Sequence, residues 1–323
     1  MKVALVAILA AVPALSQTKV TIAYPVVSVQ QIPLWIAQEQ GLFRKQGLET
    51  QLMRVDPAGN TRSRDFLIAV YGIPAIILAV GGGGERKVLL TLGAGLADGS
   101  VVVRPGIRKP EDLRGKRVGI GIRGTGTWIT WMRVLKHFGL DEKRDRIQFV
   151  EAPPQITEAL EAGRIDAAVL DPARCAEFLA KGFSVLLDLH SAGITGIQTA
   201  LAVDGAYLRE HPGVVEKVVT GIVEGIAFSV APANRRIVEE TLMAHMRIST
   251  QEAARRGYES FLLRMNRKPY ASVEALKQAQ RVIALHDPNV LKLKMEDMIE
   301  ERFLRNLDES GALDRIYSSY GAK

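Results

Sequence analysis

The sequence predicts an α/β protein of two similar lobes, each with a mostly parallel sheet flanked by helices. Strand and helix patterns alternate through roughly the first 200 residues, which is the order expected of a parallel sheet covered by helices. The order of elements also recurs. An aspartate, an apolar strand, a loop with proline, a helix, glycine and a further strand follow one another from Asp65 and again from Asp166.

The first set of elements occupies residues 19–92. Its first helix is expected over Pro33–Gln46, where apolar residues recur at helical spacing and Gly47 is a natural helix stop. The rest of the set comprises strands at 19–26, 48–55, 66–70 and 87–92, and a short helix at 74–80 that ends in a run of glycines.

A second set follows. It comprises a helical turn at 110–113, strands at 117–122, 146–150, 165–170 and 184–189, and helices at 127–138, 155–162 and 173–181, each followed by glycine. The apolar triplets Val101–Val103 and Leu201–Val203 bracket this set, and we expect them to be two crossover strands between the lobes. After about Tyr207 the pattern is helical to the end of the chain.

The chain opens with a pattern typical of a secretory signal peptide. Lys2 provides a positive start, Val3–Leu15 is apolar or small, and Ala14 and Ser16 are small residues at an A-x-A-like cleavage site. The run is shorter than the roughly 20 apolar residues that a membrane-spanning helix needs. A short anchor or a buried first strand is the alternative interpretation.

The expected organisation therefore has four parts. Residues 1–16 are the signal peptide, 17–103 the first part of lobe one, 104–200 lobe two, and 201–323 the return to lobe one with a helical C-terminal region.

Composition and charge argue against several classes of protein. The formal net charge is +7, but the basic residues are scattered and no aromatic residues are interleaved among them, which argues against nucleic-acid binding. Mild basicity suits an anionic solute. Cys175 is the only cysteine, so no internal disulfide can form, and a small core residue is its simplest interpretation.

Four segments, in order, resemble one family of periplasmic binding proteins. They are Pro33–Phe43 (PLWIAQEQGLF), Ile107–Gly119 (IRKPEDLRGKRVG), Leu160–Ala167 (LEAGRIDA) and Met295–Leu307. The family serves ABC importers for nitrate, sulfonates, taurine and thiamine precursors. One segment departs from its pattern: Asp56–Asp65 is polar and short where the family has a helix, so we expect the wall on that side of lobe one to be open or rebuilt.

The resemblance implies a type II periplasmic binding protein fold and a periplasmic protein that captures a small solute, inorganic or organic, for an importer. The implied partners are that solute and a permease with its ATPase. The protein would act as a monomer, without a cofactor or metal, would not bind nucleic acid, and would meet the membrane only through the permease. The alternatives are an enzyme on the same scaffold that makes a thiamine or menaquinone precursor, and a sensor that presents its ligand to a receptor.

Such a fold binds its ligand with loops at strand ends and helix N-termini, where unpaired N–H groups favour anions and polar heads. The candidate binding residues are Ser28, Gln30, Gln31, Tyr71, Gly72, Ile73, Thr125, Gly126, Thr127, Asp171 and Thr195. The segment Gly124–Thr127 is the best candidate, because it places two hydroxyls and exposed N–H groups at a helix start. Ser28 and Asp171 could instead be helix caps, and Tyr71 could be a core residue.

Signals for catalysis are weak. Gly119–Gly124 matches G-x-G-x-x-G, but its first two glycines fall inside a predicted strand rather than in the turn after it, which argues against dinucleotide binding. The histidines lack metal-ligand spacing, and no G-x-S-x-G segment occurs. The sequence therefore favours a binding protein over an enzyme.

Overall fold

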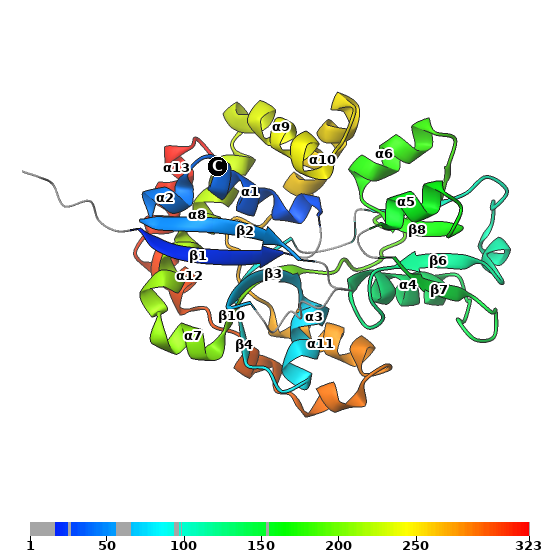
Figure 1. The fold of residues 1–323 in the computed structure, drawn as a ribbon, viewed down its shortest axis with the longest axis horizontal. Helices are drawn as coiled ribbons and strands as arrows, with labels where there is room; N and C mark the ends of the chain where they lie inside the picture. The colour runs from blue at the N-terminus through cyan, green and yellow to red at the C-terminus, as the bar shows by residue number, and fades with distance from the viewer. Residues whose placement is uncertain are drawn as a thin grey trace, which may run out of the picture.

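The computed structural model describes residues 17–24, 27–55, 66–93, 97, 99–152 and 155–322. These residues form two α/β lobes that lie side by side (Figure 1). The predicted fold class is therefore confirmed. The expected signal peptide at 1–16 and the shortened segment at 56–65 lie outside the described residues.

Lobe one contains a five-stranded sheet in the order β2-β1-β3-β10-β4. Its strands are β1 (Thr18–Tyr24), β2 (Leu48–Arg54), β3 (Ile68–Gly72), β4 (Arg86–Leu92) and β10 (Thr199–Asp204). β1 is parallel to β2 and β3, whereas β10 is antiparallel to both of its neighbours. The antiparallel strand is the one that returns from lobe two.

Lobe two repeats this plan in the order β7-β6-β8-β5-β9. Its strands are β5 (Ser100–Val103), β6 (Arg117–Ile120), β7 (Gln148–Glu151), β8 (Ala167–Leu170) and β9 (Ser184–Asp188). β5 is antiparallel to β8 and β9, and each apolar triplet lies in the strand that directly follows a crossing between the lobes. Because β5 already belongs to the second sheet, the first part of lobe one ends before Ser100 rather than at residue 103.

Helices cover both sheets. Lobe one carries α1 (Ile32–Glu39), α2 (Leu42–Lys45), α3 (Ile73–Gly81), α7 (Gly205–Glu210), α8 (Pro212–Val230), α9 (Arg235–Met246), α10 (Gln251–Arg264), α11 (Val273–Ile283), α12 (Arg302–Glu309) and α13 (Ala312–Ser319). Lobe two carries α4 (Gly126–His137), α5 (Ile156–Glu161) and α6 (Pro172–Ala180). The single helix expected over 33–46 is split into α1 and α2, because Gly41 adopts a left-handed conformation with φ of 68°.

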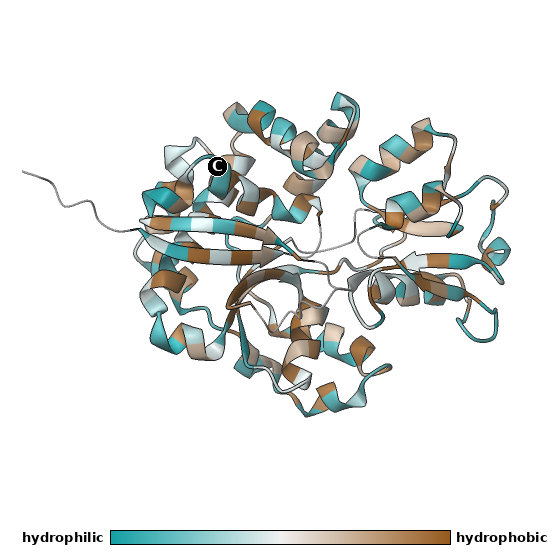
Figure 2. Cartoon of the chain, in the orientation of Figure 1, coloured by the Kyte–Doolittle hydropathy of each residue, from teal (hydrophilic) through white to brown (hydrophobic). Residues whose placement is uncertain are grey.

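The cores follow from this arrangement. Strands and helices of lobe one bury a large apolar cluster that includes Trp35, Phe43 and Phe261. Figure 2 shows hydrophobic residues along β3, inside lobe one, and hydrophilic residues on the outer helices. Within the described part of the chain, no helix combines the length and the hydropathy that crossing a membrane would require.

Two connections join the lobes. The first runs from β4 to β5 and the second from β9 to β10. They are hydrogen-bonded to each other: the Ala97 N–H donates to the Ile194 carbonyl at 2.8 Å, and the Leu189 N–H donates to the Gly99 carbonyl at 3.0 Å. This paired connection lies beside the site described next.

Candidate ligand-binding site

A cavity of about 650 Å³ lies between the lobes. It is bordered by the carboxyl ends of parallel strands: residues after β1, β2 and β3 in lobe one, and after β6 and β8 in lobe two. This is the edge at which open α/β sheets bind ligands. Backbone groups and side chains of both lobes therefore face one shared space, which is open to solvent on one side.

Nine of the eleven candidate residues line this cavity. They are Ser28, Gln30, Gln31, Tyr71, Gly72, Thr125, Gly126, Thr127 and Asp171. The fold thus brings together four loops that are up to 143 residues apart in the chain, as from Ser28 to Asp171. Their contact with a ligand stays a prediction.

The other two candidates lie outside the cavity wall. The N–H of Ile73 donates to the carbonyl of Gln198 at 2.9 Å, and the Ile73 side chain is buried in an apolar core cluster instead of lining the cavity. Thr195 is exposed, and its carbonyl accepts a hydrogen bond from Arg133 at 2.7 Å. Neither residue is among those that line the cavity, and their contact with a ligand stays a prediction.

The N-terminus of α4 is a wall of the cavity. Thr125 is the N-cap residue, but its hydroxyl donates to the Ile122 carbonyl at 2.6 Å, and the Thr127 hydroxyl accepts from the Gly121 N–H at 2.6 Å. Neither hydroxyl caps the helix. The hydroxyls shape the loop, and the first-turn N–H groups of α4 are left to face a ligand, where they favour negative charge.

We expect the double variant Thr125→Ala with Thr127→Ala to lose both stability and affinity for the solute. The loss of the two hydroxyls removes the partners of Ile122 and Gly121, which costs up to about 1–3 kcal/mol for each of these half-buried groups. Urea unfolding and calorimetric titration measure the two effects. Thr220→Ala is the control, because that hydroxyl donates to a helix carbonyl at an exposed site. Unchanged affinity in the double variant would remove this loop from the site.

Two candidates act as helix caps as well as wall residues. The Ser28 hydroxyl donates to Gln31 Oε1 at 2.6 Å, in a capping box ahead of α1. Asp171 Oδ1 accepts from the N–H of Arg174 at 3.1 Å and caps α6. The capping interpretation that the sequence left open is therefore correct for both residues.

Sequence reasoning missed three arginines that line the cavity. Arg54 ends β2, Arg174 lies in the first turn of α6, and Arg264 ends α10. Arg174 Nε lies 3.4 Å from Asp171 Oδ2, and its Nη1 donates to the Thr157 hydroxyl at 3.2 Å. With one aspartate against three guanidinium groups, the charged residues of the wall are mostly cationic.

Gln30 holds Arg264 in place. In the amide orientation that pairs donors with acceptors, its oxygen accepts from Arg264 Nη1 at 2.8 Å and Nη2 at 3.0 Å, and its nitrogen donates to the Thr199 hydroxyl. Arg264 Nη2 also donates to the Ile197 carbonyl at 3.2 Å. No periodicity in the sequence links a residue of α10 to the loop before α1, so only the fold could identify this contact.

The lobes touch on both sides of the cavity. On one side α6 of lobe two packs on α10 of lobe one (Figure 1), and the N–H of Ser249 donates to Glu177 Oε1 at 2.9 Å. On the other side the rings of Trp128 and His286 lie 5.9 Å apart. The two lobes are therefore in direct contact beside the cavity.

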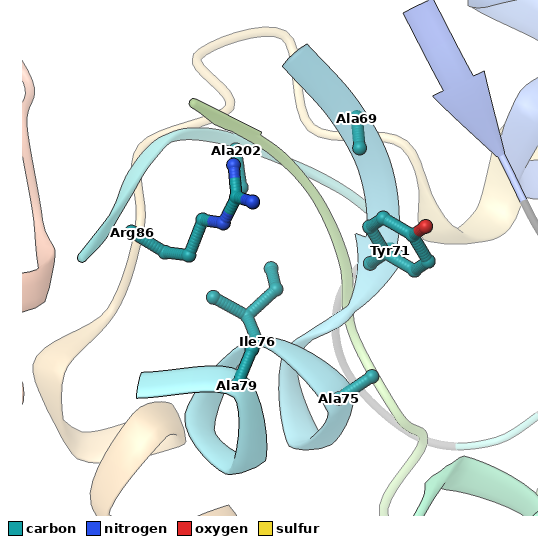
Figure 3. A pocket seen from close by; sticks show the side chains of 7 residues that line it. All are labelled: Ala69, Tyr71, Ala75, Ile76, Ala79, Arg86 and Ala202. Carbon is teal, nitrogen blue, oxygen red and sulfur yellow. The ribbon is translucent and has the colours of Figure 1, made fainter. Parts of the chain in front are cut away.

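A much smaller cavity, of about 10 Å³, lies between α3 and the sheet of lobe one. Tyr71, Ala75 and Ala79 line both cavities and so form the partition between them. Figure 3 shows Tyr71 on one side of the small cavity and Arg86 on the other. Its volume suits about one water molecule, so it is packing space rather than a second site.

The described residues give little support for a metal site or for thiol chemistry at the cavity. Among them no group of three His, Cys, Asp or Glu side chains lies close enough to hold a metal ion. Cys175 is buried and does not line the large cavity, and burial raises the pKa of its thiol. It is a core residue, as its sequence context indicates.

The chain is similar in sequence to known proteins. The profile of the NMT1/THI5-like family matches residues 28–234. The taurine-binding periplasmic protein of Escherichia coli (strain K12) is 31% identical over 206 residues, which span 61% of this chain and 62% of that relative.

Two solved structures share the fold. The alkanesulfonate-binding protein SsuA from Xanthomonas axonopodis pv. citri, bound to MOPS, is 18% identical with a TM-score of 0.70, over 88% of this chain and 99% of that one. The desulfurization enzyme DSZB is 18% identical with a TM-score of 0.64, over 91% of this chain and 100% of that one.

Proposed function

This chain belongs to the NMT1/THI5-like family, and we propose that it is the extracytoplasmic solute-binding component of an ABC importer, which captures a small organic anion by closing its two lobes. The family resemblance indicated by its sequence motifs is confirmed, and the curated relative named above is a periplasmic binding protein. The transport role and the nature of the solute are the parts that we propose.

The observation that carries the proposal is the cavity enclosed by both lobes. A solute there contacts the ends of β1–β3 and the N-terminus of α4 at once, so it binds the closed form more tightly than an open one. Closure would then be a population shift about the paired crossover connections, and the closed form would be the one that docks on the permease. We expect the protein to do this in the periplasm.

Charge and size support an organic anion. The lining guanidinium groups and the uncapped start of α4 favour negative charge. A cavity of about 650 Å³ is in the range that holds organic ligands, and its wall includes Leu78, Ile122 and Ile197. An inorganic ion such as nitrate would leave most of this apolar wall uncovered.

An enzyme on this scaffold is the second candidate, since the desulfurization enzyme DSZB shares the fold. The described wall offers poor support for it. Ser28 is the only serine on that wall and already donates to Gln31, and neither cysteine nor histidine is among the described lining residues. These observations favour binding over nucleophilic or acid–base catalysis.

We expect at least one organic anion to stabilise the protein in a thermal-shift panel of nitrate, taurine, MOPS, 1-butanesulfonate, benzoate and an aminopyrimidine. At 100 times its Kd a ligand that binds only the folded state adds about 2.7 kcal/mol to the free energy of unfolding. Uncharged 1-butanol is the matched control for 1-butanesulfonate and should give no shift. A protein that no solute stabilises and that turns over a metabolite instead would contradict the proposal.

Two cellular measurements separate the remaining alternatives. Fractionation of cells that express the full chain should place it in the periplasm, and retention in the cytoplasm would favour the enzyme. Uptake of the stabilising anion should fall when the gene is deleted. Uptake that is unchanged by the deletion would favour a ligand-presenting sensor.

A further inference from the structure

We propose that Arg54 captures the anionic group of the solute at the opening of the cavity and thereby selects for charge. This inference rests on the proposed function, because it assigns one residue to the recognition of the anion. Arg54 is the last residue of β2, pairs in register with Tyr24 at the end of β1, and lines the cavity. Its side chain is exposed as well, so it stands where the cavity meets solvent.

Arg54 differs from the two other arginines of the wall. Arg174 is held by Asp171 and Thr157, and Arg264 is held by Gln30 and the Ile197 carbonyl. Both guanidinium groups therefore already donate hydrogen bonds to other groups of the protein. Within the described part of the chain, no residue forms an ion pair or a hydrogen bond with the Arg54 side chain.

A guanidinium that no described residue binds suits this role for two reasons. Its planar set of donors matches a carboxylate or sulfonate with two parallel hydrogen bonds, and a hydrogen bond to a charged group is stronger than a neutral one. An exposed cation at the rim of a cleft also attracts an anion before contact, which raises the association rate at low salt.

The place of Arg54 in the fold leaves its side chain available to bind an anion. Among the residues that the structure describes, the side chain of Arg54 neither caps a helix nor joins the lobes, and its strand lies at the edge of the sheet, next to β1. Its backbone remains in the β1–β2 ladder whichever side chain it carries. Substitution of the side chain should therefore leave folding intact.

The test compares Arg54→Gln and Arg54→Lys with Arg44→Gln. Arg44 is exposed on α2 of lobe one and does not line the cavity, so its variant removes the same charge elsewhere. The probe is whichever anion among nitrate, taurine, MOPS, 1-butanesulfonate and benzoate gives the wild-type protein its largest thermal shift. Calorimetric titration gives Kd, and stopped-flow mixing at two salt concentrations gives the association rate.

We expect Arg54→Gln to raise Kd about tenfold or more, with an unchanged unfolding midpoint and a weaker salt dependence of the association rate. The Kd of Arg54→Lys should lie between those of the wild type and Arg54→Gln, since lysine keeps the charge and loses the paired donors. Arg44→Gln should bind within about twofold of wild type.

Two results would overturn the inference. If the wild-type protein binds an anion and Arg54→Gln binds it equally well, the role of Arg54 is wrong while the proposed function stands. If the wild-type protein binds no anion of the panel, the proposed function is contradicted and this inference falls with it.

Discussion

We expect Ala173→Leu to hold the lobes apart and to weaken solute binding by about 5- to 150-fold. Ala173 lies on α6 of lobe two, yet it is fully buried in the apolar cluster of lobe one. A Cβ placed at Gly257 of α10 would lie only 3.2 Å from the Ala173 Cβ, so the two helices meet through small residues. A larger side chain in such a contact costs about 1–3 kcal/mol, and here the cost falls on the closed state alone.

Calorimetric titration measures the loss of affinity, and small-angle scattering should report a larger radius of gyration for the Ala173→Leu protein. Ala180→Leu is the matched control, because Ala180 is exposed at the end of the same helix. Its affinity and radius of gyration should equal those of the wild type. If Ala173→Leu binds solute as tightly as the control, the contact between α6 and α10 is not part of the closed state that binds.

The second large effect concerns stability. We expect Gly225→Ala to lower the free energy of unfolding by up to about 2 kcal/mol, because overpacking costs about 1–3 kcal/mol and the better helix propensity of alanine returns about 1 kcal/mol. A Cβ at position 225 of α8 would lie 2.3 Å from the Pro33 carbonyl oxygen and 3.3 Å from the Ala37 Cβ. A backbone carbonyl cannot rotate aside as a long side chain can, so α1 would have to move as a unit.

Urea unfolding measures this loss. Gly213→Ala is the matched control, since a Cβ at that position of α8 meets nothing within 4 Å. That variant should be neutral or gain up to about 1 kcal/mol. Equal stabilities of the two variants would contradict the close approach of α1 and α8. Because α1 follows the loop of Ser28, Gln30 and Gln31, the shift in Gly225→Ala should weaken solute binding as well.

Short-range sequence patterns were sufficient to predict most of the strands and helices. Apolar periodicity located the strands and helices, and glycines that adopt positive φ, such as Gly139, Gly163 and Gly182, marked helix ends. Gly41 shows the limit of this reasoning: the apolar spacing continued through it, but its left-handed backbone ended α1. The polar segment Asp56–Asp65 was named from the sequence and lies outside the described residues.

The site was predictable only in part. Loops at helix N-termini were found because their Ser, Thr and Gly residues have local consequences, and most of them line the cavity. Ile73 and Thr195 lie outside the lining, because a residue next to a lining residue can be buried in the core, as Ile73 is, or exposed to solvent, as Thr195 is. Arg54, Arg174 and Arg264 were missed, because an arginine at the end of a strand or on a helix has the same sequence pattern whether it faces water or a cavity.

By itself, the sequence determined the two-lobed α/β plan, the crossover strands, the family and the loops at which a ligand should bind. These features depend on short-range patterns of residue type, which can be read directly from the sequence. Only the tertiary structure decided which side chains share the cavity, that α10 supplies Arg264 to Gln30, and that Ala173 of one lobe is buried by the other. Such contacts join residues far apart in the chain, and their geometry depends on how the two sheets and their helices pack.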